Sequence, residues 1–175
     1  DVGRVGVETV AFQLEEAIFY VMDMLSPLAA QKHINMAFYY AENIPQHVIG
    51  DALRFKQILT NLISNAIKFT PDGEIIVRVR MEDEDIGQCL LHFSVQDSGI
   101  GLSGTDRKKL FESFSQGDAS VTRQFGGTGL GLAISKQLVH LMHGQIGFED
   151  NQERAPTEKG STFWFTASFK VDEQD

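Results

Sequence analysis

Cysteine is almost absent from this chain: Cys89 is the only one among 175 residues, so an internal disulfide is excluded. Prolines are also few, and Pro45, Pro71 and Pro156 fall between periodic segments, where they mark the ends of elements. The 15 basic residues are outnumbered by 24 acidic ones, and a net charge of −9 argues against unaided binding to nucleic acid or anionic membranes. No apolar run approaches the roughly 18 residues of a membrane span, so we expect this fragment not to be membrane-inserted.

Length and hydropathy predict a single domain. With 175 residues, 42% of them hydrophobic, the chain can bury about 70% of the surface that it exposes when unfolded. The same apolar content argues against disorder. Glycine is distributed unevenly, since 8 of the 16 glycines lie between Gly99 and Gly131. We therefore expect the chemistry of the protein to lie in or next to this segment.

Hydrophobic periodicity predicts three main helices and several strands. Apolar residues recur at helical spacing over residues 13–31, over 54–69 after a possible cap at Asp51, and over 130–143. Extended segments are predicted over residues 7–12, 34–41, 74–81, 90–96, 145–149 and 161–171, a solvated hairpin tip over 82–87, and a short helix over 108–114. Because hairpins join several strands, we expect an α/β fold in which helices cover one face of a mixed, mainly antiparallel sheet.

The helix predicted over residues 54–69 has an unusual polar side. Gln57, Asn61, Asn65 and Lys68 share one face, although asparagine is a poor helix former. Amide oxygens followed by a cation could hold hydrated Mg²⁺ together with the phosphates that it chelates. The alternative is a partly exposed helix face that tolerates two asparagines.

Two glycine-rich loops follow. The first, residues 99–104, has the spacing of a dinucleotide-binding fingerprint, but Asp97 places a carboxylate where a pyrophosphate would have to approach, so we reject that interpretation. Asp97 could instead accept a hydrogen bond from an exocyclic amine, with Gly99 and Gly101 leaving room for a flat base. The second loop, residues 126–131, runs into a helix whose N-terminus could face phosphates. The alternative for each loop is a flexible turn.

Together these segments resemble the catalytic ATP-binding domain of sensor histidine kinases, in the superfamily that includes gyrase, Hsp90-type chaperones and MutL. Five segments are similar to motifs of that family, in the family's order: residues 51–70 (N box), 97–101 (G1 box), 110–116 (F box), 127–131 (G2 box) and 160–162. Residues 116–131 look most like those of large hybrid kinases, which carry receiver domains. The resemblance implies the two-layer α/β sandwich of that superfamily, the Bergerat-type ATP-binding fold.

The resemblance also implies residue roles. Asp97 would bind the adenine amine, Phe69 would line the base pocket, and Thr162 would support Asp97 directly or through water. Lys68 and Arg123 would contact phosphates, and Asn65, with Asn61 nearby, would coordinate Mg²⁺. The remaining expected nucleotide contacts are Gly99, Gly101, Phe114, Gly127, Thr128, Gly129, Leu130 and Gly131, and residues 112–128 would form a lid over ATP.

The expected reaction is phosphoryl transfer in which Asn61, Asn65 and Lys68 act as catalytic residues. ATP-hydrolysing relatives carry a glutamate at the position of Asn61, and an amide cannot act as a general base, so hydrolysis should be poor. The acceptor would be a histidine on dimerisation helices, because the family's Ser-His-Glu-type motif does not occur here. Alternatives are a self-contained ATPase and a non-catalytic, nucleotide-dependent interaction module.

The resemblance further implies a domain layout. Residues 1–175 would form one catalytic domain, with residues 1–7 as a linker from the dimerisation helices and residues 172–175 as a tail. The expected partners are those helices and a downstream receiver domain or response regulator. The expected location is the cytoplasm, in a parent protein of the bacterial inner membrane.

Overall fold

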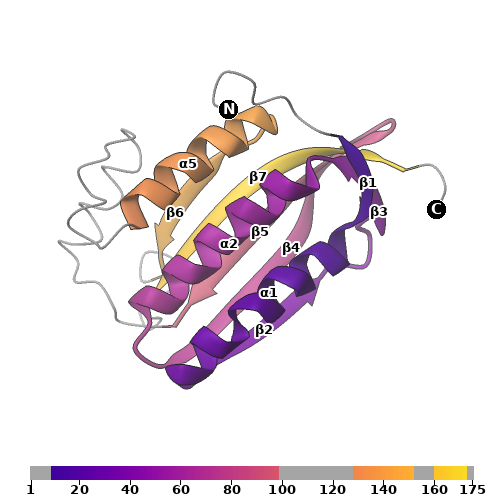
Figure 1. Cartoon of the computed structure of the whole chain (residues 1–175). Helices are drawn as coiled ribbons and strands as arrows, with labels where there is room; N and C mark the ends of the chain where they lie inside the picture. The colour runs from indigo at the N-terminus through magenta and orange to yellow at the C-terminus, as the bar shows by residue number, and fades with distance from the viewer. Residues whose placement is uncertain (1–8, 99–127, 152–159, 173–175) are drawn as a thin grey trace.

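The computed structural model describes residues 9–98, 128–151 and 160–172. Three helices, α1 (Leu14–Gln31), α2 (Ala52–Phe69) and α5 (Thr128–Leu141), lie on one face of a sheet (Figure 1). The sheet contains β1 (Val10–Gln13), β2 (Ile34–Tyr40), β3 (His47–Gly50), β4 (Gly73–Asp85), β5 (Gln88–Asp97), β6 (Ile146–Asp150) and β7 (Ser161–Val171). The predicted α/β class with a mixed sheet is confirmed.

The strand order is β1-β3-β7-β5-β4-β2, and β6 pairs with β7. The pair of β2 and β4 is parallel, and the other strand pairs are antiparallel. A crossover through α2 brings β4 beside β2, because a parallel neighbour cannot be reached by a tight hairpin. Strands β5 and β7 therefore lie near the middle of the sheet, with α2 packed above β5.

The core lies between α2 and the sheet. Phe55 of α2 is fully buried, and its ring centroid lies 4.9 Å from that of Phe93 on β5. Phe93 in turn stacks on Phe165 of β7 at 4.7 Å. Fully burying an aromatic or aliphatic side chain contributes roughly 1.5–3 kcal/mol, so this cluster holds the site-bearing helix firmly against the central strands.

Asp51 caps α2 as the sequence predicts. Its Oδ1 accepts a hydrogen bond from the backbone N–H of Arg54 at 3.0 Å, and its Oδ2 lies 3.2 Å from the Arg54 Nε. The cap satisfies one of the N–H groups that a helix leaves unpaired at its first turn. The start of α2 is thus set by a short-range signal that the sequence carries.

The predicted bounds of one hairpin are wrong, and one strand was missed. The acidic residues 82–85 form strand rather than a hairpin tip, since Glu84 pairs with Cys89 and Asp85 with Gln88. The turn is confined to Ile86 and Gly87, where Gly87 has a φ of 72°. Strand pairing continues through the acidic run because its carboxylates are exposed to solvent. The four-residue strand β3 was not predicted at all.

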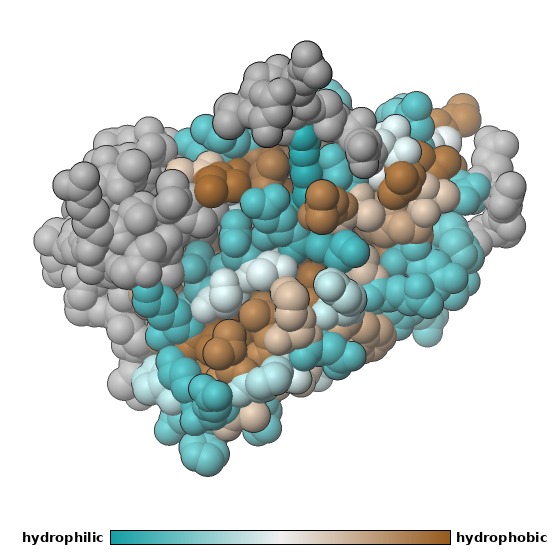
Figure 2. All heavy atoms as spheres, in the orientation of Figure 1, coloured by the Kyte–Doolittle hydropathy of each residue, from teal (hydrophilic) through white to brown (hydrophobic). Residues whose placement is uncertain are grey.

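The two surfaces of the molecule differ in character. On the helical face, Phe19, Tyr20, Met24 and Leu28 of α1 keep 47%, 60%, 49% and 48% of their surface exposed, and brown surface lies among teal there (Figure 2). None of the three helices covers the opposite face of the sheet, which we call the open face, and the residues that β4, β5 and β7 expose there are mostly polar (Figure 1). Within residues 9–98, 128–151 and 160–172, no helix is long and apolar enough to cross a membrane.

The structure predicts that Cys89 is unreactive. Burial and the nearby Glu84 carboxylate raise the pKa of the Cys89 thiol to about 11. Because only the thiolate attacks, a pKa raised by about two units lowers the reactive fraction near pH 8 roughly a hundredfold. We expect a thiol-reactive dye to label the folded chain at least about a hundredfold more slowly than the urea-unfolded chain. Equal rates in the two states would contradict this burial.

Candidate nucleotide site at one end of the sheet

The last turns of α2 carry the predicted asparagines. Asn65 is only 4% exposed, and its Nδ2 finds no hydrogen-bond partner among the residues that the structure describes. The Thr70 Oγ1, fully buried just after the helix, also has no hydrogen-bond partner among the described residues. A buried polar group without a partner costs about 1–3 kcal/mol. The alternative of a partly exposed helix face does not agree with the burial of Asn65. A ligand with oxygen atoms could instead accept a hydrogen bond from the Asn65 Nδ2.

Asn61 is held from a second helix. Its Nδ2 donates a hydrogen bond of 3.1 Å to the Ser135 Oγ, which is fully buried on α5. This contact joins α2 to the helix that follows the second glycine-rich loop. Ser135 was not predicted, because it is 74 residues away in sequence and no local pattern marks it.

A lysine that the sequence analysis missed secures the end of α2. The Lys32 ammonium donates to the backbone oxygens of Ile67 and Lys68, at 2.6 and 3.1 Å. These carbonyls belong to the last turn, where a helix has unpaired acceptors and a negative dipole end. Lys68 itself has an exposed side chain. Phe69, at the end of the helix, is partly buried against the core.

Asp97 occupies the last position of β5 and is only 4% exposed. Its Oδ1 accepts a hydrogen bond from the Ser161 N–H at 3.2 Å. Its backbone oxygen accepts from the Asn151 Nδ2 at 3.0 Å, and the Asn151 Oδ1 accepts from the Thr162 Oγ1 at 2.7 Å. Thr162 therefore acts on the Asp97 main chain through Asn151, a residue absent from the predicted set.

Gly160 allows the start of β7 to approach Asp97. It has a φ of 96°, in the left-handed region that favours glycine. A Cβ at this position would lie 2.0 Å from the Asp97 backbone oxygen and 2.9 Å from its Oδ1. The glycine of the short motif at residues 160–162 is therefore required by contact with Asp97 itself.

These elements converge. The C-terminal ends of α2 and β5, the start of β7 and the N-terminus of α5 all lie at the same end of the molecule (Figure 1). Thr128, Gly129, Leu130 and Gly131 form the first residues of α5. Such a helix N-terminus presents N–H groups and a positive dipole end, which suits phosphate.

The other predicted site residues, Gly99, Gly101, Phe114, Arg123 and Gly127, lie outside the described residues, as do nearly all of the lid predicted over 112–128 and the short helix over 108–114. Among the described residues, no group of three or more His, Cys, Asp or Glu side chains could hold a metal ion. The candidate metal ligands thus remain the two amides of Asn61 and Asn65.

Comparison with known proteins agrees with this architecture. Residues 50–171 match the family model described as histidine kinase-, DNA gyrase B- and HSP90-like ATPase, and the chain belongs to this family. It is homologous to the catalytic ATP-binding part of hybrid sensor histidine kinases, as the sequence resemblance predicts.

Three relatives show the similarity. The chain is 41% identical over 175 residues to the sensor histidine kinase GacS of Pseudomonas protegens, covering all of this chain and 18% of that protein. It is 38% identical over 165 residues to the histidine-protein kinase BarA of Escherichia coli, covering 94% and 17%. It is 36% identical over 174 residues to the sensory/regulatory protein RpfC of Xanthomonas campestris, covering 99% and 23%. The chain thus spans less than a quarter of these relatives.

Solved structures show the same fold. Full-length ShkA, crystallised in complex with AMPPNP, superposes with a TM-score of 0.72 at 31% identity, over 96% of this chain and 32% of that chain. The catalytic domain of the histidine kinase ThkA, in a nucleotide-free form, gives a TM-score of 0.68 at 25% identity, over 94% and 99%. The second match shows that a solved catalytic domain has nearly the extent of this chain.

Proposed function

We propose that this domain binds Mg·ATP and transfers the γ-phosphoryl group to a histidine on dimerisation helices outside these 175 residues. The observation that carries the proposal is the buried carboxylate of Asp97, held by Ser161 and Asn151 at the end of the sheet where α2 ends and α5 begins. The kinase names of the relatives and the AMPPNP complex of ShkA support it.

Asp97 would select adenine. A carboxylate accepts hydrogen bonds and donates none, so it complements an exocyclic amine. The Ser161 N–H fixes the plane of the carboxylate through Oδ1, and Asn151 fixes the main chain behind it. This preorganisation means that the pocket loses little freedom when a base enters. Phe69, Gly99 and Gly101 would form the surroundings of the base.

The phosphates would lie between the ends of α2 and α5. Lys68 and Arg123 would donate to phosphate oxygens, and residues 127–131 would present N–H groups at the start of α5. Asn65 and Asn61 would hold Mg²⁺ through amide oxygens, a ligand type that this ion accepts. Bound Mg²⁺ would supply positive charge to the phosphate chain. The buried Asn65 Nδ2, which lacks a protein partner among the described residues, would donate to a phosphate or water oxygen while the Asn65 Oδ1 faces the ion.

In the transfer step, a P–N bond to the acceptor histidine forms while the bond between the γ-phosphorus and its bridging oxygen breaks, and ADP leaves. Lys68 and Arg123 would stabilise the charge that develops on the phosphoryl oxygens. No side chain activates water at Asn61, because an amide is not a general base. The acceptor would therefore be a histidine and not water, and a receiver domain would take the phosphoryl group afterwards.

Asn65→Ala is expected to weaken binding of Mg·AMPPNP about tenfold to a hundredfold, the effect of losing a hydrogen bond or ligand to a charged group. Isothermal titration with and without Mg²⁺ measures this affinity. The loss should be seen only in the part of the AMPPNP affinity that depends on Mg²⁺. Gln57→Ala is the matched control, because Gln57 is an exposed amide two turns earlier on the same helix. Wild-type affinity in Asn65→Ala would remove Asn65 from the site.

The cellular setting is part of the same proposal. A parent kinase of the bacterial inner membrane would place this domain in the cytoplasm, next to its dimerisation helices and upstream of a receiver domain or response regulator. The hybrid kinases among the relatives support this arrangement.

A further inference from the structure

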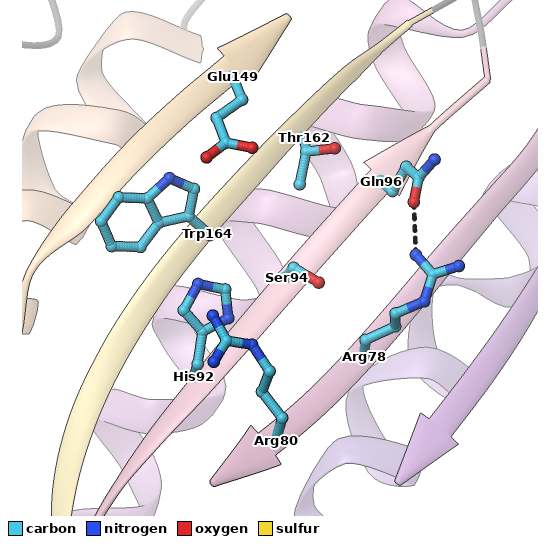
Figure 3. A pocket seen from close by; sticks show the side chains of 8 residues that line it. All are labelled: Arg78, Arg80, His92, Ser94, Gln96, Glu149, Thr162 and Trp164. Atoms are coloured by element: carbon cyan, nitrogen blue, oxygen red, sulfur yellow. Dashed lines mark hydrogen bonds between the residues drawn. The ribbon is translucent and has the colours of Figure 1, made fainter. Parts of the chain in front are cut away.

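The open face of the sheet carries a hollow that shares only Thr162 with the proposed nucleotide site. Its volume is about 440 Å³, within the range of small-molecule pockets. It lies on the side of the sheet away from the helices (Figure 3). The lining residues are Arg78, Arg80, His92, Ser94, Gln96, Glu149, Thr162 and Trp164, contributed by β4, β5, β6 and β7.

Strand register explains the shape. Ser94 in the middle of β5 pairs with Arg78 on β4 and with Trp164 on β7. Neighbouring strands lie about 4.8 Å apart, so roughly 10 Å separate the backbones of Arg78 and Trp164. A small serine thus forms a floor between two of the largest side chains.

Trp164 forms a flat platform at one side of this floor. Its indole lies almost parallel to the His92 imidazole, with an interplanar angle of 18° and ring centroids 5.4 Å apart. A Cβ at Gly147 of β6 would lie 2.4 Å from the Trp164 Cζ2, so the absence of a side chain at Gly147 leaves room for the ring. Figure 3 shows the broad face of the indole turned outward. Such a face offers stacking to another flat ring.

The other side of the hollow is cationic. Arg78 and Arg80 are two residues apart on β4 and project from the same face. Arg78 donates to the Gln96 Oε1 and lies 5.6 Å from the centroid of the Tyr39 ring, so its guanidinium is held in place. Arg80 is paired with Glu82, but its side chain is 58% exposed and remains accessible. Burial and the Arg80 charge lower the pKa of His92, which keeps the imidazole neutral near pH 7.

We propose that this hollow is a second ligand site, for a small ligand that joins a flat heteroaromatic ring to a phosphate, of the nucleoside monophosphate class. The ring stacks on Trp164, the phosphate binds Arg80 and Arg78, and Ser94 and Gln96 offer polar contacts between them. Two guanidiniums and one carboxylate, Glu149, line the hollow, and a second carboxylate, Glu82, pairs with the exposed Arg80. A phosphate that replaces Glu82 at Arg80 meets both guanidiniums, although the chain as a whole carries −9. That overall charge disfavours a nucleic-acid polymer and leaves a small anion as the occupant.

The test uses the 175-residue chain and inosine monophosphate, whose base lacks the exocyclic amine that Asp97 is proposed to bind. Trp164 is the only tryptophan in the chain, so its fluorescence, excited at the red edge where the nucleotide does not absorb, reports on this hollow. Saturable quenching is expected, with a dissociation constant below about 1 mM. Inosine alone and inorganic phosphate alone should each bind at least about tenfold more weakly, because each retains one half of the contacts.

Arg80→Ala should raise the dissociation constant of inosine monophosphate, measured by quenching, about tenfold or more. The reason is that the substitution removes a hydrogen bond to the charged phosphate. Lys170→Ala is the matched control, because it removes an exposed positive charge from β7 outside the lining. Thr162 is left unchanged, because its hydroxyl also bonds Asn151 beside Asp97. Asp97→Asn should leave the titration unchanged, which separates this site from the ATP site.

Three results would overturn the proposal: no saturable change in Trp164 fluorescence, an equal effect of Arg80→Ala and Lys170→Ala, or loss of the signal in Asp97→Asn. The site does not depend on the proposed kinase function. Failure of Mg·ATP binding alongside a normal inosine monophosphate titration would contradict only the kinase proposal.

Discussion

Asp97→Asn is expected to bind a non-hydrolysable ATP analogue about a hundredfold more weakly than the wild-type chain. The substitution removes one hydrogen bond to a charged group and leaves one donor without an acceptor. An asparagine keeps one acceptor oxygen and gains an NH₂ group. In the pocket, that group must face either the Ser161 N–H, which now donates to the Asp97 Oδ1, or the proposed adenine amine. Either arrangement sets a donor against a donor.

Isothermal titration with Mg·AMPPNP measures this loss. Asp83→Asn is the matched control, because it makes the same chemical change at an exposed position on β4. Thermal melting shows whether the variant remains folded. A folded Asp97→Asn protein that binds within about twofold of wild type, a difference of less than 0.5 kcal/mol by the usual conversion, would remove Asp97 from the adenine pocket.

Gly160→Ala should be among the most destabilising single substitutions in the chain. The new Cβ would lie 2.0 Å from the Asp97 backbone oxygen, and the backbone would stay at a φ of 96°. Overpacking costs about 1–3 kcal/mol, and a left-handed conformation costs a further 1–2 kcal/mol for a residue with a side chain. We expect a loss of about 2–5 kcal/mol in the free energy of unfolding, measured by urea titration.

Gly87→Ala is the control for Gly160→Ala. Gly87 also has a positive φ, of 72°, but nothing lies within 4 Å of an added Cβ. It should therefore cost only the conformational part, about 1–2 kcal/mol. Equal losses in the two variants would show that the Asp97 main chain yields easily. If the contact is rigid, Gly160→Ala should also lower nucleotide affinity, because it displaces Asp97.

The sequence predicts the helices better than the strand ends. Helix α2 has strong apolar periodicity and a capping aspartate at Asp51, and both signals are local. Strand β3 has only four residues, which is too short for alternation to stand out, and it exists because β1 and β7 pair with it. The composition of the acidic end of β4 predicts a loop. Pairing with β5 nevertheless continues, because the carboxylates of β4 face solvent.

In the candidate site, too, local sequence signals predict some residues, and long-range contacts determine the others. Asn61, Asn65, Lys68 and Asp97 stand out because they occur in compact motifs that resemble a family. Three supporting residues have no such signal. Lys32, Ser135 and Asn151 contact groups that lie 35, 74 and 54 residues away in sequence, so their roles arise from the tertiary fold alone. Scattered positions of this kind cannot be recognised in a single sequence.

The hollow on the open face can be predicted from the sequence only in part. Arg78 and Arg80 alternate with buried residues of β4, so the sequence places both on the solvent side of a strand. Nothing in the sequence indicates that Ser94 and Trp164 lie in one row with Arg78. That fact depends on the register of β4, β5 and β7, which long-range pairing sets.

Phosphotransfer to dimerisation helices is the most direct test of the central claim. The chain is mixed with the separately purified dimerisation helices of its parent kinase and with γ-labelled ATP and Mg²⁺, and labelled protein is assayed for acid-labile phosphate. We predict label on the histidine of the helices with the wild-type chain, about a hundredfold less with Asp97→Asn at subsaturating ATP, and little release of free phosphate by the chain alone. Helices that stay unlabelled while the chain binds Mg·ATP, or steady phosphate release without helices, would contradict the account.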